Sequence, residues 1–162
     1  MSDETHRFSC KMTWTGAAAG GTKDYATYSR EVRVDIDGKP PLTMSSAPAF
    51  VGDPKVHNPE DLLMAALSSC HFLTYAALCA RSGIEMIGYE DEASGVMEKV
   101  DRVVKFTSAV LRPKVVLAAG TTPEKLDLAK RLHAKAHTHC FIASSVNFPV
   151  TNEPAITVQP PP

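Results

Sequence analysis

The longest apolar segment of the chain lies between Asp61 and Arg81, where 19 consecutive residues include no Asp, Glu, Lys or Arg. The segment is preceded by Asn58-Pro59, in which Asn58 suits the N-cap and Pro59 the first helical position. Ser82-Gly83 is typical of a helix end. The pattern therefore predicts a helix over about 59–81. Because apolar residues occur on every side of the helical wheel, we expect this helix to be buried all round.

Shorter patterns predict the elements on either side of this helix. Period-two alternation and turn residues indicate strands at about 6–14, 28–36, 42–45, 85–98, 102–118 and 148–158. Thr122-Pro123-Glu124 opens a second helix, with Thr122 as its N-cap and an apolar stripe that runs to Ala136. The resulting order, βββ-α-ββ-α-β, predicts a mixed α+β fold.

Size and composition narrow the protein's class. A chain of 162 residues with 44% hydrophobic content predicts one domain over 1–162, with a disordered tail from about 159. A formal charge of −1 offers no electrostatic footprint for nucleic acid. The uncharged segment is long enough for a membrane span, but Ser68, Ser69, His71 and Thr74 dilute it and no second segment exists, so we expect no membrane association.

The N-terminal sequence and the spacing of the cysteines indicate the cellular compartment of the protein. The N-terminus is polar and acidic and does not resemble a signal peptide. The four cysteines show neither a CxxC motif nor the pattern of a small secreted protein. We therefore expect a cytoplasmic protein, in which any disulfide would be transient and catalytic.

Cys70 lies near the middle of the uncharged helix. A thiol there is either a small core residue or a reactive group. It is too far from the helix N-terminus to be activated by the helix dipole, which fades within the first turn. A reactive Cys70 therefore needs a cation from elsewhere in the fold, because an arginine or a protonated histidine favours the thiolate.

Cys140 follows the second helix in the sequence His137-Thr138-His139-Cys140 and leaves more than one interpretation open. With Cys70 or His71, these side chains would supply four ligands for a metal, although the spacing matches no standard zinc pattern. A hydrolase that uses Cys70 with a histidine is a second possibility, but His71 points about 100° away on the helix.

The other two cysteines, Cys10 and Cys79, are interpreted as packing residues. Cys79 lies about 13 Å from Cys70 along one helix, so these two cannot form a disulfide.

Arg30 and Arg33 are the candidate cations. At i and i+3 of one strand they point to opposite faces, so we expect one to face solvent and the other the core. An arginine that enters an apolar core needs a carboxylate partner, and Glu60 is available.

Three segments carry a resemblance to a known family: HNPEDLLMAALSSCHFLTYAA, GYEDEASG and HCFIASSVNFPV. They contain both informative thiols, and the order of elements agrees along nearly the whole chain. The protein resembles the OsmC/Ohr family, especially its OsmC-like branch. The resemblance implies antiparallel sheets wrapped around long central helices, in an intertwined homodimer with two active sites at the subunit interface.

The resemblance also implies an activity. Family members are thiol-dependent peroxidases that reduce organic hydroperoxides or hydrogen peroxide without a cofactor, and an external dithiol restores them. By position, Cys70 would be the peroxidatic cysteine and Cys140 the resolving one. Glu60 matches the family glutamate, and Arg30 is the best match for the family arginine, with Arg33 as the alternative. His71 and His139, which neighbour the two thiols, depart from the better characterised branches.

Helix geometry adds an expectation about assembly. Glu60 and Cys70 are ten residues apart, which is about 15 Å along one helix. An arginine held by Glu60 would not easily reach Cys70 of the same chain. Two such helices packed antiparallel would bring Glu60 of one chain nearer Cys70 of the other, so we expect a composite site.

Overall fold

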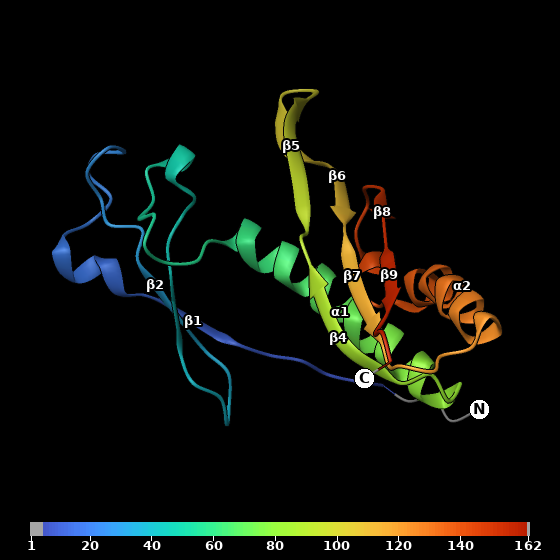
Figure 1. Ribbon diagram of the computed structural model, residues 1–162. Coiled ribbons are helices and arrows are strands. Elements are labelled where there is room, and N and C mark those ends of the chain that lie inside the picture. The colour runs from blue at the N-terminus through green and yellow to red at the C-terminus, as the bar shows by residue number, and fades with distance from the viewer. Residues whose placement is uncertain (1–4, 162) are drawn as a thin grey trace. The chain divides into compact units, whose positions relative to one another are not determined.

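The computed structural model describes residues 5–161 (Figure 1). In chain order its elements are β1 (Lys11–Trp14), β2 (Val32–Asp35), β3 (Leu42–Met44), α1 (Pro59–Arg81), β4 (Met86–Asp91), β5 (Ser94–Val100), β6 (Val103–Leu111), β7 (Pro113–Leu117), α2 (Pro123–His139), β8 (Val150–Asn152) and β9 (Ala155–Val158). Short 3-10 turns occur at Thr15–Ala19, Pro48–Phe50 and Ala143–Ser145. The chain divides into two compact units, which meet within α1 after Leu62.

The N-terminal unit is built on an antiparallel sheet of order β1-β2-β3. Its strands pair in simple register, with Thr13 opposite Arg33 and Arg33 opposite Thr43. The segment between β3 and α1 doubles back on itself, because Ser45 N–H donates to His57 O and Gly52 N–H donates to Ala47 O.

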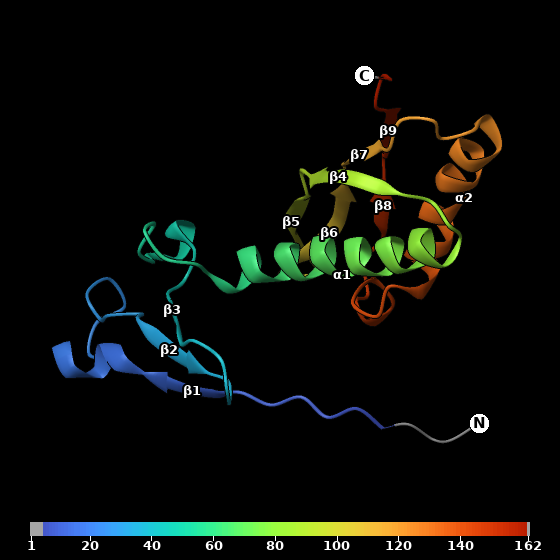
Figure 2. The ribbon, with the colours of Figure 1, turned by 60° about the horizontal axis from the view of Figure 1, so that its bottom comes forward.

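The C-terminal unit contains most of α1, all of α2 and two three-stranded sheets, of order β4-β7-β9 and β5-β6-β8. One core cluster joins α1 to α2 and to β7, and includes Tyr75, Leu117 and Leu132. A second cluster joins α1 to β6 and β8, through Leu67, Leu111 and Val150. The helix α1 therefore packs against both sheets of this unit (Figure 2).

The ends of both helices form as their sequences predict. Asn58 Oδ1 accepts the Asp61 N–H at 2.8 Å, which satisfies one free donor of the first turn of α1. Thr122 Oγ1 accepts the Lys125 N–H at the start of α2. After α1 the chain turns through Gly83 at φ 63°, a left-handed conformation that favours glycine.

The expectation that α1 is buried all round is wrong for the single chain. A stripe of four residues at i, i+4 spacing is buried, namely Leu67, His71, Tyr75 and Cys79. The opposite stripe is exposed to solvent and contains Ala65, Ser69, Leu73 and Ala77. The protein's own sheets and α2 cover only one side of the helix. By length and composition alone α1 could also cross a membrane, but its buried stripe forms part of a protein core.

Three predicted strands are correct in place but wrong in extent or pairing. The runs expected at 85–98 and 102–118 are each two strands, divided at Glu92-Ala93 and at Arg112. The Arg112 N–H donates to the Asp91 side chain at the division, which takes it out of the ladder. The final run is also two strands, and these pair in parallel, β8 with β6 and β9 with β7. The two sheets of the C-terminal unit are therefore mixed rather than purely antiparallel.

The sequence predicts one domain over 1–162 that ends in a disordered tail. The prediction of a single domain stays a prediction. Gln159 N–H donates to Leu117 O, so the disordered tail expected from about 159 does not include that residue. Pro162 lies outside the described residues.

We predict that Gly52→Ala destabilises the protein more than Gly21→Ala. A Cβ on Gly52 would lie 1.6 Å from the Ser46 carbonyl oxygen, a backbone atom that cannot move without disrupting the loop, whereas one on Gly21 meets nothing within 4 Å. We expect a loss of roughly 1–3 kcal/mol or more for Gly52→Ala and less than about 0.5 kcal/mol for Gly21→Ala. Urea unfolding measures both, and equal stabilities would contradict this loop geometry.

Candidate active site

The structure brings Cys70 and Cys140 together. Cys70 lies on α1 and Cys140 caps the C-terminal end of α2, and the Cys70 side chain lies close enough to Cys140 to raise the pKa of its thiol. Cys70 is partly exposed, whereas Cys140 is only 1% exposed. Two thiols in this relation can exchange a proton, and with an oxidant they can form a disulfide.

The surroundings of Cys140 keep it protonated. Burial raises the pKa of the Cys140 thiol to about 11, and the neighbouring Cys70 side chain acts in the same direction. Two backbone N–H groups, of Ile142 and Ala143, oppose this shift, the latter at 3.5 Å from Cys140 Sγ. Cys140 is therefore a neutral thiol that can donate its S–H to the sulfur of Cys70.

The other two cysteines lie apart from this pair. Cys79 belongs to the core, and its burial raises the pKa of its thiol. It is a packing residue, as predicted. Cys10 is exposed, so its interpretation as a packing residue is wrong.

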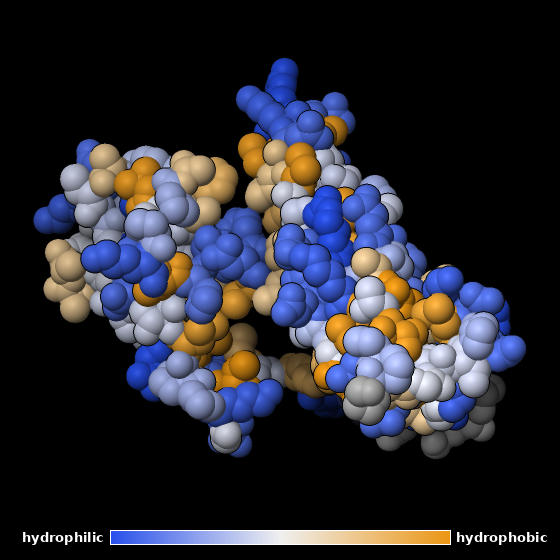
Figure 3. Space-filling view, in the orientation of Figure 1, coloured by the Kyte–Doolittle hydropathy of each residue, from blue (hydrophilic) through white to orange (hydrophobic). Residues whose placement is uncertain are grey.

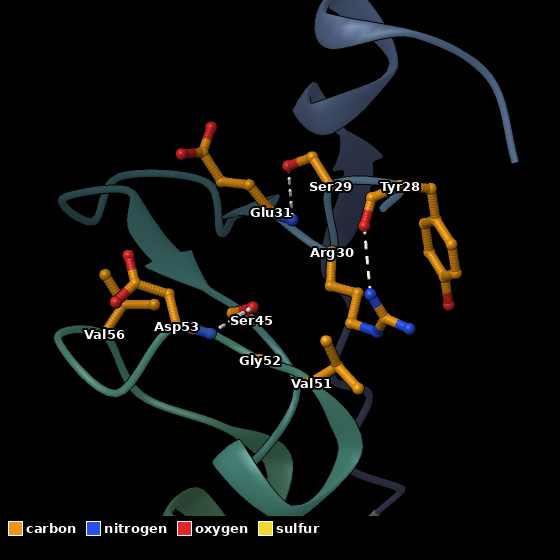
Figure 4. A pocket seen from close by; sticks show the side chains of 9 residues that line it. All are labelled: Tyr28, Ser29, Arg30, Glu31, Ser45, Val51, Gly52, Asp53 and Val56. Atoms are coloured by element: carbon orange, nitrogen blue, oxygen red, sulfur yellow. Dashed lines mark hydrogen bonds between the residues drawn. The ribbon is translucent and has the colours of Figure 1, made fainter. Parts of the chain in front are cut away.

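Arg30 lies in a cavity of about 310 Å³ within the N-terminal unit (Figure 4). Its guanidinium donates to the carbonyls of Tyr28 at 3.0 Å and Tyr25 at 2.5 Å, and it lies over both aromatic rings at 4.0 and 4.8 Å. Figure 4 shows the arginine running past Val51, while Glu31 points away from it. Two of its five N–H groups are thus engaged, and the rest are available to a ligand.

Arg33 has a different setting. It lies in β2 and forms an ion pair with Asp35, with its Nη2 2.8 Å from Asp35 Oδ1 and half of its side chain exposed. Arg30 precedes that strand and is 9% exposed. The expectation that one arginine faces solvent and the other the interior is confirmed, with Arg30 as the interior one.

The expected pair between Arg30 and Glu60 does not form among the described residues. Within one chain, carbonyl oxygens and tyrosine rings surround the guanidinium in place of a carboxylate. A pair between Arg30 and Glu60 in an assembled dimer stays a prediction. Glu60 lies in the first turn of α1, and its Oε2 is buried without a hydrogen-bond partner. A buried carboxylate oxygen without a donor is costly, so Glu60 is a site that a further cation would satisfy.

A buried histidine pair joins α1 to α2. His71 Nε2 and His133 Nδ1 are 3.1 Å apart, and the ring of Tyr75 stacks on His133 with centroids 3.8 Å apart. Burial lowers the pKa of both imidazoles to about 4. Sequence reasoning did not single out His133, although its spacing from Ala129 and Ala136 places it on the buried stripe of α2.

The two alternatives considered from sequence find little support in this geometry. His139 is exposed, with Nδ1 2.8 Å from the Lys135 carbonyl, and among residues 5–161 no three side chains of the ligand types are arranged to hold a metal ion. For a hydrolase, the Nε2 of His71 is engaged by His133, and the side chain that interacts with Cys70 is the thiol of Cys140.

We predict that the histidine pair makes the fold less stable in acid. Because the pKa values are about 4 in the folded chain and 6.5 for an ordinary imidazole, the unfolded chain binds protons first, and stability falls as pH drops from 6.5 toward 4. Between pH 7 and pH 5 we expect a loss of roughly 2 kcal/mol per histidine.

Urea unfolding at the two pH values measures this loss. His71→Phe/His133→Phe should lose most of the dependence, and the exposed His139→Gln should retain it. Should the double variant not fold, NMR titration of the wild-type imidazoles decides, because a His133 that is protonated at pH 5 would contradict the prediction.

Comparison with known proteins identifies the family of the chain. A family model described as OsmC-like protein matches residues 52–154. An OsmC-like protein of unknown function from Vibrio cholerae is 31% identical, with a TM-score of 0.84 over 93% of this chain and 100% of that one. The uncharacterised protein YmaD of Bacillus subtilis is 28% identical over 142 residues, or 87% of each chain.

A structure named for peroxide resistance shares the fold at lower identity. The organic hydroperoxide resistance protein OhrB of Bacillus subtilis is 21% identical, with a TM-score of 0.60 over 91% of this chain and 98% of that one. This likeness concerns the fold. Together with the family match over most of the chain, it shows that the protein belongs to the OsmC-like family and has the OsmC/Ohr fold.

Proposed function

We propose that the protein is a cofactor-free thiol peroxidase that reduces organic hydroperoxides or hydrogen peroxide. The observation that carries the proposal is that Cys70 and Cys140, thiols that are 70 residues apart in sequence, lie close enough for one to shift the pKa of the other. Family membership supports a role in peroxide resistance, and the solved structures with this fold include organic hydroperoxide resistance proteins.

The proposed cycle has three steps. The Cys70 thiolate attacks one oxygen of the peroxide, the O–O bond breaks, and the other oxygen leaves as an alcohol or water after taking a proton. Cys70 is then a sulfenic acid. The Cys140 sulfur attacks it, water leaves, and a Cys70–Cys140 disulfide forms. An external dithiol reduces that disulfide by exchange and is itself oxidised.

The different exposure of the two thiols suits these two roles. Cys70 is the sulfur that solvent and substrate reach, and Cys140 is the buried sulfur behind it. The charge on Cys70 contributes to holding the proton on Cys140. Oxidation of Cys70 to a neutral sulfenic acid removes that charge, so the resolving thiol ionises more easily when it is needed.

A homodimer would complete the site. The exposed stripe of α1 has no charge from Ala65 to Ala77, and hydrophobic side chains gather on the surface over α1 and β4 (Figure 3). A second α1, antiparallel to the first, would cover this stripe. It would also bring the unpaired Glu60 of one chain toward Cys70 of the other.

Arg30 is the proposed activating cation. It is interior, it keeps N–H groups free, and arginine stays charged when partly buried. In the assembled site it would bind Glu60 and lie beside the Cys70 thiolate. A cytoplasmic location would supply the reducing dithiol.

We predict that the protein consumes cumene hydroperoxide when a dithiol is supplied, and that Cys70→Ser abolishes turnover. Cys79→Ser is the matched control, because that thiol lies on the same helix but in the core, and it should turn over normally. In Cys140→Ser the sulfenic acid should persist or oxidise further, detected by mass spectrometry. Normal turnover in Cys70→Ser would assign the activity to another group.

We predict that Arg30→Ala slows alkylation of Cys70 and shifts its pH profile upward, while Arg33→Ala does little. Arg33 already neutralises Asp35, whereas Arg30 has no carboxylate partner among the described residues. A shift of one to three pH units is expected by analogy with charge pairs of carboxylates, about 1.4 kcal/mol for each unit. If only Arg33→Ala moves the profile, the roles of the two arginines are reversed.

A further inference from the structure

A cleft separate from the thiol pair is lined by residues of α2 and β8 in the C-terminal unit. Its volume is about 620 Å³, which is within the range of small-molecule pockets. One face of α2 contributes Lys130, His133 and His137, and the facing strand contributes Asn152. Among residues 5–161, no aspartate or glutamate lines it.

Three lining side chains have buried polar atoms without a hydrogen-bond partner: His133 Nε2, His137 Nδ1 and Asn152 Oδ1. His133 is only 2% exposed, and because its Nδ1 faces His71, Nε2 is its one remaining polar atom. Native proteins leave few buried polar groups unpaired, because each one costs free energy. Three of them on one cleft indicate a wall that a polar ligand completes.

The charge and hydrogen-bonding capacity of the wall favour an anion. Lys130 is the charged residue of the lining, and its exposed ion pair with Asp127, at 3.3 Å, is of a kind that contributes little and leaves donors free. The imidazoles of His133 and His137 can each present an N–H. The amide of Asn152 presents its NH₂ after a half-turn about its side chain. Each of the four groups can therefore donate a hydrogen bond.

The hydrogen bond between His71 and His133 supports the same orientation. When His71 donates from Nε2 to Nδ1 of His133, the proton of His133 must be on Nε2, the nitrogen left for the cleft. An anion in the cleft would select this tautomer. The Nε2–H of His133 would then donate to the anion while its Nδ1 accepts a hydrogen bond from His71.

We propose that this cleft is a binding site for a small organic molecule that is held by its carboxylate group. The carboxylate accepts from His133, His137 and Asn152, with Lys130 at the same wall supplying the countercharge. The site lies close to the redox pair in the chain, since the His137 carbonyl accepts the N–H of Cys140 at 3.3 Å. It does not depend on peroxidase activity.

Binding is tested by NMR of the ¹⁵N-labelled histidine rings, with butyrate as the probe and butyramide as its neutral counterpart. Butyrate should shift the ring signals of His133 and His137 in a saturable way and should fix the proton of His133 on Nε2. Butyramide should bind at least about tenfold more weakly, because it lacks the charge that strengthens each hydrogen bond.

Variants locate the binding in the cleft. Lys130→Gln and Asn152→Leu should each weaken butyrate binding about tenfold, whereas Lys135→Gln, which removes a lysine of α2 outside the lining, should not. The proposal is overturned if butyrate causes no saturable shift, if butyramide binds equally well, or if Lys130→Gln binds butyrate like Lys135→Gln. Lys130 is at the surface, so this last comparison holds even if Asn152→Leu does not fold.

Discussion

The structure depends on how one uncharged helix is covered. Helix α1 buries the stripe from Leu67 to Cys79 against both sheets of its unit and leaves the opposite stripe open. Apolar surface left in water opposes folding, and a partner that covers it gains free energy. Cys70 lies between the two stripes and is partly exposed. The helix therefore holds the thiol where one side contacts the protein's own Cys140 and another side remains open.

The contact between the thiols depends on the end of α2. Thr122 caps the start of that helix, and its buried stripe packs Ala129, Leu132 and Ala136 against α1. Cys140 follows the last turn of α2 and therefore lies in the interior beside Cys70. The same packing presses His133 against His71, so one helix interface supports both the thiol pair and the neutral imidazoles at the inner wall of the cleft.

Local features of the sequence predicted the elements well. The bounds of α1 and the cap at Thr122 follow from residues within a few positions of each helix end, and the resemblance anticipated the Cys70–Cys140 contact. What the sequence could not provide depends on distant residues. The final strands β8 and β9 pair in parallel with β6 and β7, which lie some 40 residues earlier in the chain. The hydrogen bonds from Arg30 to the carbonyls of Tyr25 and Tyr28 depend on how a loop folds back. His133 was overlooked because the histidine that it contacts is 62 residues away.

The most direct test of this account is a thiol count. The reduced protein is treated with one equivalent of cumene hydroperoxide, denatured, and its free thiols are measured with a chromogenic disulfide. We expect the count to fall from four to two, with Cys10 and Cys79 as the thiols that remain. A count that stays at four, or a disulfide that peptide mapping places on any pair other than Cys70 and Cys140, would contradict the central claim.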